Sequence, residues 1–330
     1  MDIVKYMQVF AGALAISLFL TPTVRAAALK FGIVDRPDKD LKAHSAPVAY
    51  FGGIAIFLSF LGVLLIVSRG KLTGFHGLLL GSWMVFALGL IDDLKKLSVP
   101  VKFFVQACAA IVLVLSGIRV DFLGNPALNI IVSVLWTVGI TNAFNLLDIM
   151  DGLSSGIALI ACLVFFALGL AYGRIFSPTA SLALAGACFG FLIYNFPPAK
   201  IFMGDAGSLF LGFLLAALSM TESYSYKNSI AVFSPLLILG VPLFDTLFVM
   251  CMRWKQGKPV YYGSPDHFPL RLRRAGLSVR QVLLTSYSAA ALLGAAGFAV
   301  TLLSPIMSGA LYAIVLVLAL VAAVKLSNTG

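Results

Sequence analysis

Long apolar runs separated by short polar segments are the dominant pattern of this chain. Most of these runs approach the ~20 residues that a helix needs to cross the ~30 Å hydrocarbon core of a bilayer. They are too long and too evenly apolar to be the alternating strands of a membrane barrel. We therefore expect an all-α polytopic membrane protein, a bundle of about 10–11 transmembrane helices in which residues 1–330 form a single integral-membrane domain. The eleven runs cover residues 3–24, 50–68, 74–91, 100–117, 127–145, 153–173, 179–196, 206–221, 229–252, 281–303 and 307–325.

The composition agrees with this pattern, because 61% of the residues are hydrophobic and only 11% are charged. A soluble domain carries about 25% charged residues. If the runs alternate across the membrane, 17 of the 23 Lys and Arg residues fall on one side. The positive-inside rule makes that side cytoplasmic and places the N-terminus outside. The net charge of +10 is then explained by short basic loops near lipid headgroups, and we expect no nucleic-acid partner.

The acidic residues gather on the same side of this topology. Ten of the thirteen fall on or near the predicted cytoplasmic face, and twelve of the thirteen are Asp. Acidic residues contribute little to membrane topology, so the sidedness rule does not explain this asymmetry. The polar chemistry is therefore gathered on one face of the membrane.

The first polar motif is IDDLKKLSVPVK, residues 91–102, at the end of an apolar run. Two adjacent carboxylates, Asp92 and Asp93, can hold Mg²⁺ or share a proton, because like charges raise one pKa of the pair. An isolated pair of this kind would also suit a solvated helix end. Lys102 lies inside the first turns of the next run, which makes a solvated role harder to accept and favours a phosphate contact.

The second motif is TNAFNLLDIMDGLS, residues 141–154. Asn142, Asn145, Asp148 and Asp151 recur every three residues, which keeps them near one face of a helix end. Polar side chains at the mouth of a span are costly if they face lipid. The full set is therefore more indicative of function than Asp151-Gly152 alone, which would be an ordinary turn.

The third motif is AKIFMGDAGSLFLG, residues 199–212. Asp205 would make an ordinary helix N-cap. It would also serve as a metal ligand beside backbone N–H groups that point at phosphate. Phe202 is placed to stack on a base.

Further polar residues follow in the last third of the chain. Asp245 lies about two helical turns inside a predicted span, where an ionisable group is a functional hypothesis by default. His267 and Arg271, in the basic segment 253–280, are candidates for binding a diphosphate. Lys42 and His44, ahead of a Gly-Gly pair, give a weaker signal of the same kind.

The chain contains neither a Walker GxxxxGK[ST] motif nor a GxGxxG motif, so no soluble nucleotide-binding fold is implied. The ordered set DD, NAFNLLDxMDG, FMGDAGSL, PxFD and a late DHF…R resembles the polyprenyl-phosphate N-acetylhexosamine-1-phosphate transferases. This superfamily, of glycosyltransferase family 4 type, also contains the phospho-N-acetylmuramoyl-pentapeptide transferases. The resemblance runs from about Asp35 to Leu277.

The resemblance implies a reaction at the cytoplasmic face of a bacterial inner membrane. A UDP-N-acetylhexosamine, with UDP-GlcNAc as the default, donates its sugar-1-phosphate to polyprenyl (undecaprenyl) phosphate and releases UMP. The implied cofactor is Mg²⁺, with Mn²⁺ as the alternative, and a homodimer is compatible with the family. The implied catalytic residues are Asp92, Asp93, Asp205 and His267, of which the first three are the metal ligands. The implied substrate-binding residues are Lys42, His44, Lys102, Asn142, Asn145, Asp148, Asp151, Phe202, Asp245 and Arg271.

Two alternatives remain open at this point. The pentapeptide-using branch shares these motifs, but its late motif carries a fuller histidine cluster than the single His267 found here. An ion-coupled transporter would also use intramembrane Asp residues. Its acidic residues, however, are expected near the bilayer midplane within related repeats, and no repeat is evident in this sequence.

Overall fold

The computed structural model describes residues 2–35, 47–68, 75–221, 224, 228–259 and 264–329. The chain divides into two compact units, Met1–Glu222 and Ser223–Gly330. Lys42 and His44, two predicted substrate contacts, lie outside the described residues. The expectation of a single domain over residues 1–330 stays a prediction.

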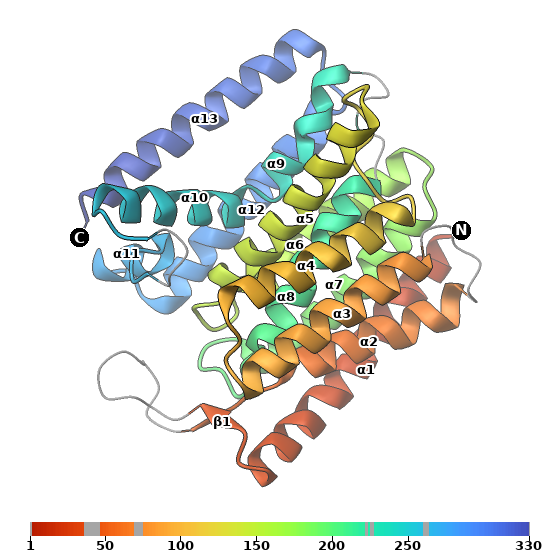
Figure 1. Cartoon of the computed structure of the whole chain (residues 1–330), viewed down its shortest axis with the longest axis vertical. Coiled ribbons are helices and arrows are strands. Elements are labelled where there is room, and N and C mark those ends of the chain that lie inside the picture. The colour runs from red at the N-terminus through yellow and green to blue at the C-terminus, as the bar shows by residue number, and fades with distance from the viewer. Residues whose placement is uncertain are drawn as a thin grey trace. The chain divides into compact units, whose positions relative to one another are not determined.

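The first unit is a bundle of long helices with one very short hairpin (Figure 1). The helix α8 is its centre, since 15 of its 18 residues are buried and it packs against α2, α3, α5 and α6. The hairpin pairs β1 with β2 in antiparallel register, Val34 opposite Ala49. The elements are α1 (Ile3–Lys30), β1 (Val34–Asp35), β2 (Val48–Ala49), α2 (Gly52–Ser68), α3 (Phe75–Leu94), α4 (Val99–Leu115), α5 (Pro126–Leu147), α6 (Leu153–Ala171), α7 (Phe176–Asn195) and α8 (Gly204–Thr221).

The second unit is also helical. Its α12 packs against α9, α10 and α11, whereas in α13 only Ser308 is buried. Its elements are η2 (Ser229–Phe233), α9 (Ser234–Ile238), α10 (Gly240–Lys255), α11 (Phe268–Arg274), α12 (Val279–Val300) and α13 (Pro305–Ser327).

These helices confirm the predicted all-α membrane class. Among the described residues, eight helices are long and apolar enough to cross a membrane, and a bent pair of helices would make a ninth. Two shorter apolar helices, Gly52–Val67 and Val99–Leu115, account for the remaining apolar runs. Each of the eleven runs therefore contains a helix.

One predicted span is not a single straight helix. The run 229–252 divides into Ser229–Ile238 and Gly240–Lys255, which meet at an angle of 73°. Pro242 explains the break, because it has no N–H to donate to the carbonyl of Ile238 and its ring clashes with that carbonyl. The segment 253–280, expected to be a loop, also contains the short helix α11.

Close contact between α3 and α8 depends on Gly89. A Cβ atom at this position would lie 2.4 Å from the backbone oxygen of Asp205 and 2.5 Å from the Cα of Ala206. Both atoms belong to the backbone and cannot move without shifting the helix.

Replacing Gly89 by Ala is expected to destabilise the protein by roughly 1–3 kcal/mol, the usual cost of overpacking. It should also lower activity, because the first turn of α8 would be displaced. Thermal unfolding in detergent measures the first effect. Gly139→Ala on α5 is the matched control, since a Cβ there meets nothing within 4 Å. Equal melting temperatures for the two variants would contradict the prediction.

Candidate active site

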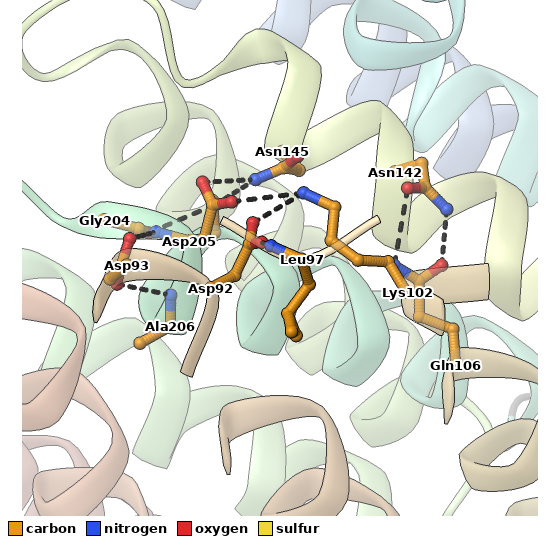
Figure 2. A network of polar contacts seen from close by, with 11 residues as sticks. Asp92, Asp93, Leu97, Lys102, Gln106, Asn142, Asn145, Gly204, Asp205 and Ala206 are labelled. Carbon is orange, nitrogen blue, oxygen red and sulfur yellow. Dashed lines mark hydrogen bonds and ion pairs between the residues drawn. The ribbon is translucent and has the colours of Figure 1, made fainter. Parts of the chain in front are cut away.

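Asp93 joins the end of α3 to the start of α8. Its Oδ1 accepts a hydrogen bond from the backbone N–H of Asp205 at 2.7 Å, and its Oδ2 accepts one from Ala206 at 3.1 Å (Figure 2). The first N–H groups of a helix have no partner within the helix, so a carboxylate placed here satisfies them. Asp93 therefore positions Asp205 as well as contributing charge.

Asp92 faces a different set of partners. Its Oδ1 accepts the backbone N–H of Leu97 at 2.7 Å, and its Oδ2 accepts a bond from the Lys102 ammonium at 2.6 Å. The same ammonium lies 3.4 Å from Oδ2 of Asp205, so it bridges two carboxylates (Figure 2). The Asp92 side chain is only 6% exposed, whereas that of Asp205 is 34% exposed. The bridged pair thus opens to solvent on the side of Asp205.

Asn145 holds the other oxygen of Asp205. Its Nδ2 donates to Asp205 Oδ1 at 3.0 Å and to the Ser208 hydroxyl at 2.9 Å. Asn142, one turn earlier on α5, contacts Gln106 of α4 instead (Figure 2). Both residues were predicted as substrate contacts. Asn145 orients the Asp205 carboxylate, whereas Asn142 links α5 to α4 through its hydrogen bond with Gln106. Gln106 was not expected from the sequence, where it looks like an ordinary polar residue in an apolar helix, and Ser208 was expected only as a possible helix N-cap beside Asp205.

Asp148 and Asp151 lie in the turn between α5 and α6. Asp151 Oδ2 accepts the backbone N–H of Ala199 at 2.9 Å, which anchors the turn to the segment before α8. Burial, together with the negative charges of Asp205, Asp93 and Asp151, raises the pKa of Asp148 to about 8.

The first unit contains a pocket of about 570 Å³. One part of its lining comes from α3, α4 and α8 and includes Asp92, Asp93, Lys102 and Asp205. Another part comes from the segment after α1 and from the hairpin, and includes Asp35 and Tyr50. Neither of these two was expected to line the site, although Asp35 is one of the ten acidic residues predicted near the cytoplasmic face.

The predicted nucleotide-stacking residue, Phe202, packs edge-on against Tyr50, with ring centroids 6.0 Å apart. It is half-buried, and its backbone N–H and carbonyl bond to Ala49 and Gly52. Phe202 therefore supports the wall that carries Tyr50.

The residues present suit a divalent cation of the magnesium kind. Within the described ranges, no group of three or more His, Cys, Asp or Glu side chains is arranged as a ready-made metal site. However, Asp92 and Asp205 each place a carboxylate oxygen near the Lys102 ammonium, at 2.6 and 3.4 Å. Mg²⁺ typically uses one or two protein carboxylates and completes its shell with water and substrate phosphates. Two carboxylates that contact the same ammonium and line one pocket fit that requirement.

The second unit contains a buried cluster of polar residues. His267 Nδ1 lies 2.6 Å from Asp245 Oδ2, and Asp245 Oδ1 accepts the N–H of Phe268 at 2.9 Å. The Asp245 carboxylate thus has two partners, the imidazole of His267 and the first backbone N–H of α11. Both side chains are buried, at 0% exposure for Asp245 and 3% for His267.

Arg271 fastens this cluster to the end of α13. Its guanidinium donates to Asp266 at 2.7 Å and to the carbonyl of Leu326 at 2.8 Å. Although partial burial opposes ionisation, hydrogen bonds from Arg271, Ser264 and Gln256 hold the pKa of Asp266 below its usual value. Arg271 was predicted to contact a diphosphate; in this structure its terminal nitrogens have protein partners.

Arg271→Met is expected to destabilise the protein by ~3–5 kcal/mol, because it leaves Asp266 buried without its charge partner. Thermal unfolding is the measurement. The double variant Asp266→Asn/Arg271→Met should recover part of the loss. Arg273→Met, at an exposed position on the same helix, should stay within ~0.5 kcal/mol of the wild type. A loss as large in Arg273→Met would contradict the assignment.

Comparison with known proteins bears on the same residues. A model of glycosyl transferase family 4 matches residues 75–223, which include the Asp92, Lys102, Asn145 and Asp205 cluster. Over 293 residues the chain is 36% identical to a probable undecaprenyl-phosphate N-acetylglucosaminyl 1-phosphate transferase of Bacillus subtilis (strain 168), covering 86% of this chain and 82% of that protein.

Two further relatives have similar names. Over 313 residues the chain is 34% identical to the decaprenyl-phosphate N-acetylglucosaminephosphotransferase of Mycobacterium tuberculosis (strain CDC 1551 / Oshkosh), covering 83% of this chain and 77% of that protein. Over 252 residues it is 34% identical to the undecaprenyl-phosphate alpha-N-acetylglucosaminyl 1-phosphate transferase of Thermotoga maritima, covering 76% of each. All three names describe a polyprenyl-phosphate acceptor and an N-acetylglucosamine phosphate.

Proposed function

The chain belongs to glycosyl transferase family 4, among the polyprenyl-phosphate N-acetylglucosaminyl-1-phosphate transferases, and from this we propose that it transfers GlcNAc-1-phosphate from UDP-GlcNAc to a polyprenyl phosphate. An oxygen of the lipid phosphate forms a bond to the β-phosphorus of the donor. The bond between that phosphorus and the oxygen bridging to the α-phosphate breaks. The products are polyprenyl-diphosphate-GlcNAc and UMP.

The observation that carries the proposal is the position of Lys102 between Asp92 and Asp205 at an open pocket. Phosphoryl transfer requires positioning and neutralisation of charge more than covalent chemistry by the protein. Both substrates are anions that repel each other, so a cationic group must lie where their phosphates meet. Lys102 supplies such a charge, and Asp92 is placed to orient the lipid phosphate.

We assign the divalent cation, Mg²⁺ with Mn²⁺ as the alternative, to Asp92 and Asp205. When bound there, it would offset charge on the diphosphate and stabilise the leaving phosphate. Asp93 keeps the first turn of α8 in place, and Asn145 orients the Asp205 carboxylate. The sequence predicted Asp92, Asp93 and Asp205 as metal ligands. In this assignment Asp92 and Asp205 are the ligands, and Asp93 positions Asp205.

The proposal places the enzyme in a bacterial plasma membrane, with its site on the cytoplasmic side and its N-terminus outside. The polyprenyl tail stays in the bilayer while its phosphate reaches the pocket, which explains why the charged residues lie at the ends of apolar helices. Undecaprenyl phosphate is the acceptor named for the relatives from Bacillus subtilis and Thermotoga maritima. The names of the relatives favour neither a pentapeptide substrate nor a transporter. A homodimer remains part of the proposal.

The test is an assay of the purified protein with UDP-GlcNAc, undecaprenyl phosphate and MgCl₂. UMP release should require all three components, and EDTA should stop it. Mass spectrometry of the lipid product should show an added GlcNAc-phosphate. Release of UMP without the lipid would contradict the proposed acceptor. Uptake of UDP-GlcNAc into liposomes without UMP would favour a carrier instead.

A further inference from the structure

The pocket has a second lysine besides Lys102. Of the described residues that line it, four carry a carboxylate and two carry an ammonium group, Lys96 and Lys102. The Lys102 ammonium contacts both Asp92 and Asp205, so its charge is already shared between two carboxylates of the protein. In the part of the chain that the structure describes, no acceptor is bonded to the ammonium of Lys96. Among these lining residues, Lys96 is therefore the cation most available to a substrate anion.

The backbone that carries Lys96 is fixed at the site. Lys96 lies in the short segment between α3, which ends at Leu94, and α4, which begins at Val99. The next residue, Leu97, donates its N–H to Oδ1 of Asp92 at 2.7 Å (Figure 2). Asp92 is the carboxylate to which the proposed function gives the orientation of the lipid phosphate. Lys96 is therefore tied through its backbone to the place where that phosphate would lie.

Apolar residues stand on either side of Lys96 in the sequence and also line the pocket. These are Leu94 and Leu97, and Leu94 is exposed. Ile91 and Leu80 lie on the same face of α3 as Leu94, since they precede it by whole helical turns, and both are exposed as well. The helix α3 is long and apolar enough to cross a membrane. An exposed apolar stripe therefore runs along a candidate span and ends at the pocket.

This combination suits an amphiphile with an anionic head. A phosphate accepts charge-assisted hydrogen bonds from an ammonium group. A hydrocarbon chain attached to it is stabilised by contact with apolar side chains. A polyprenyl phosphate has both parts. UDP-GlcNAc has an anionic diphosphate but no hydrocarbon chain to lie along α3, so the apolar stripe distinguishes the two substrates.

We propose that Lys96, Leu94 and Leu97 form the subsite for the lipid acceptor, in which the Lys96 ammonium holds the phosphate and the two leucines contact the first isoprene units. The rest of the tail follows the exposed face of α3. The donor's diphosphate is then left to Lys102 and to the divalent cation. The inference rests on the proposed function, since it names the part of the pocket that takes the acceptor.

The test measures the two substrates separately. For Lys96→Met, KM for undecaprenyl phosphate is expected to rise about tenfold, the worth of one hydrogen bond to a charged group. KM for UDP-GlcNAc and the inhibition constant of UMP should change less than about twofold. Lys96→Arg should stay within about threefold of the wild type, because an exposed guanidinium also binds phosphate. Lys95→Met is the matched control, since the neighbouring lysine is also exposed but does not line the pocket.

A second variant tests the apolar part of the subsite. Leu94→Gln should raise KM for undecaprenyl phosphate about three- to tenfold, because the contact with the isoprene chain is lost, and should leave KM for UDP-GlcNAc unchanged. Leu94 is exposed, so the fold should tolerate the change. Leu115→Gln makes the same change at an exposed position at the opposite end of α4, and it should behave as the wild type.

The outcomes separate this inference from the function on which it rests. A wild-type protein that releases no UMP would contradict the proposed function. An active wild type, together with an unchanged KM for undecaprenyl phosphate in Lys96→Met, would overturn the acceptor subsite alone. An equal rise of both KM values would also overturn it, because Lys96 would then contact the donor. The same holds for an equal effect of Lys95→Met, which would indicate surface charge, and for phosphatidic acid that competes as well as undecaprenyl phosphate binds.

Discussion

Asp205→Asn is expected to lower kcat for UMP release by roughly 10³-fold, equivalent to about 4 kcal/mol of transition-state stabilisation. The amide keeps the size of the side chain but removes the charge that, with Asp92, would hold a divalent cation. The backbone N–H of residue 205 still donates to Asp93, so the start of α8 should keep its position. The measurement is steady-state UMP release at saturating UDP-GlcNAc and undecaprenyl phosphate.

Two controls make this result specific. Asp121→Asn makes the same chemical change in the loop between α4 and α5, where the carboxylate accepts a bond from Asn129 at 3.0 Å, and it should retain activity. The melting temperature of Asp205→Asn should stay close to that of the wild type, which excludes a folding defect. Activity within about threefold of the wild type would remove Asp205 from the proposed metal site.

Lys102→Met is expected to reduce kcat/KM by roughly 10²- to 10³-fold. Without its ammonium, Asp92 loses a bond of 2.6 Å, and two anionic substrates would have to approach two uncompensated carboxylates. Arginine should restore little of the activity, because its planar guanidinium does not fit between Asp92 and Asp205 as a compact ammonium does.

The same assay with Lys95→Met provides the comparison. Lys95 is exposed and does not line the pocket, so its loss should change kcat/KM less than about threefold. Similar losses in the two variants would indicate that Lys102 acts only through the overall positive charge of this region. A loss confined to Lys102→Met, and reduced by neither higher salt nor higher Mg²⁺, supports a direct contact with phosphate.

Some features of the site were accessible from the sequence because they depend on local spacing. Asp92, Lys102 and Asp205 were all expected at a polar site, since charged residues at the ends of apolar helices are costly without a partner. Their individual partners were not accessible in this way. Adjacent residues of a helix point about 100° apart, so Asp92 and Asp93 had to have different partners, and only packing assigns the α8 terminus to Asp93.

The partners of other predicted residues also depended on how the helices pack. Asn142 and Asn145 share one face of α5, yet Asn142 meets Gln106 and Asn145 meets Asp205, because different helices cross α5 at successive turns. Arg271 was expected to contact a diphosphate because of its charge and because it belongs to the late DHF…R motif. Its burial at 3% exposure and its bonds to the end of α13 became visible only once the helices were packed.

The sequence by itself determined that this protein is a bundle of membrane helices with its acidic residues near helix ends. Hydrophobic length and composition are local properties, and lipid leaves a chain no other way to satisfy its backbone. The tertiary structure alone decided that Asp35, Tyr50, Lys102 and Asp205 line one pocket. Residues so far apart in the chain meet only through close helix contacts, such as the approach of α3 to α8 at Gly89.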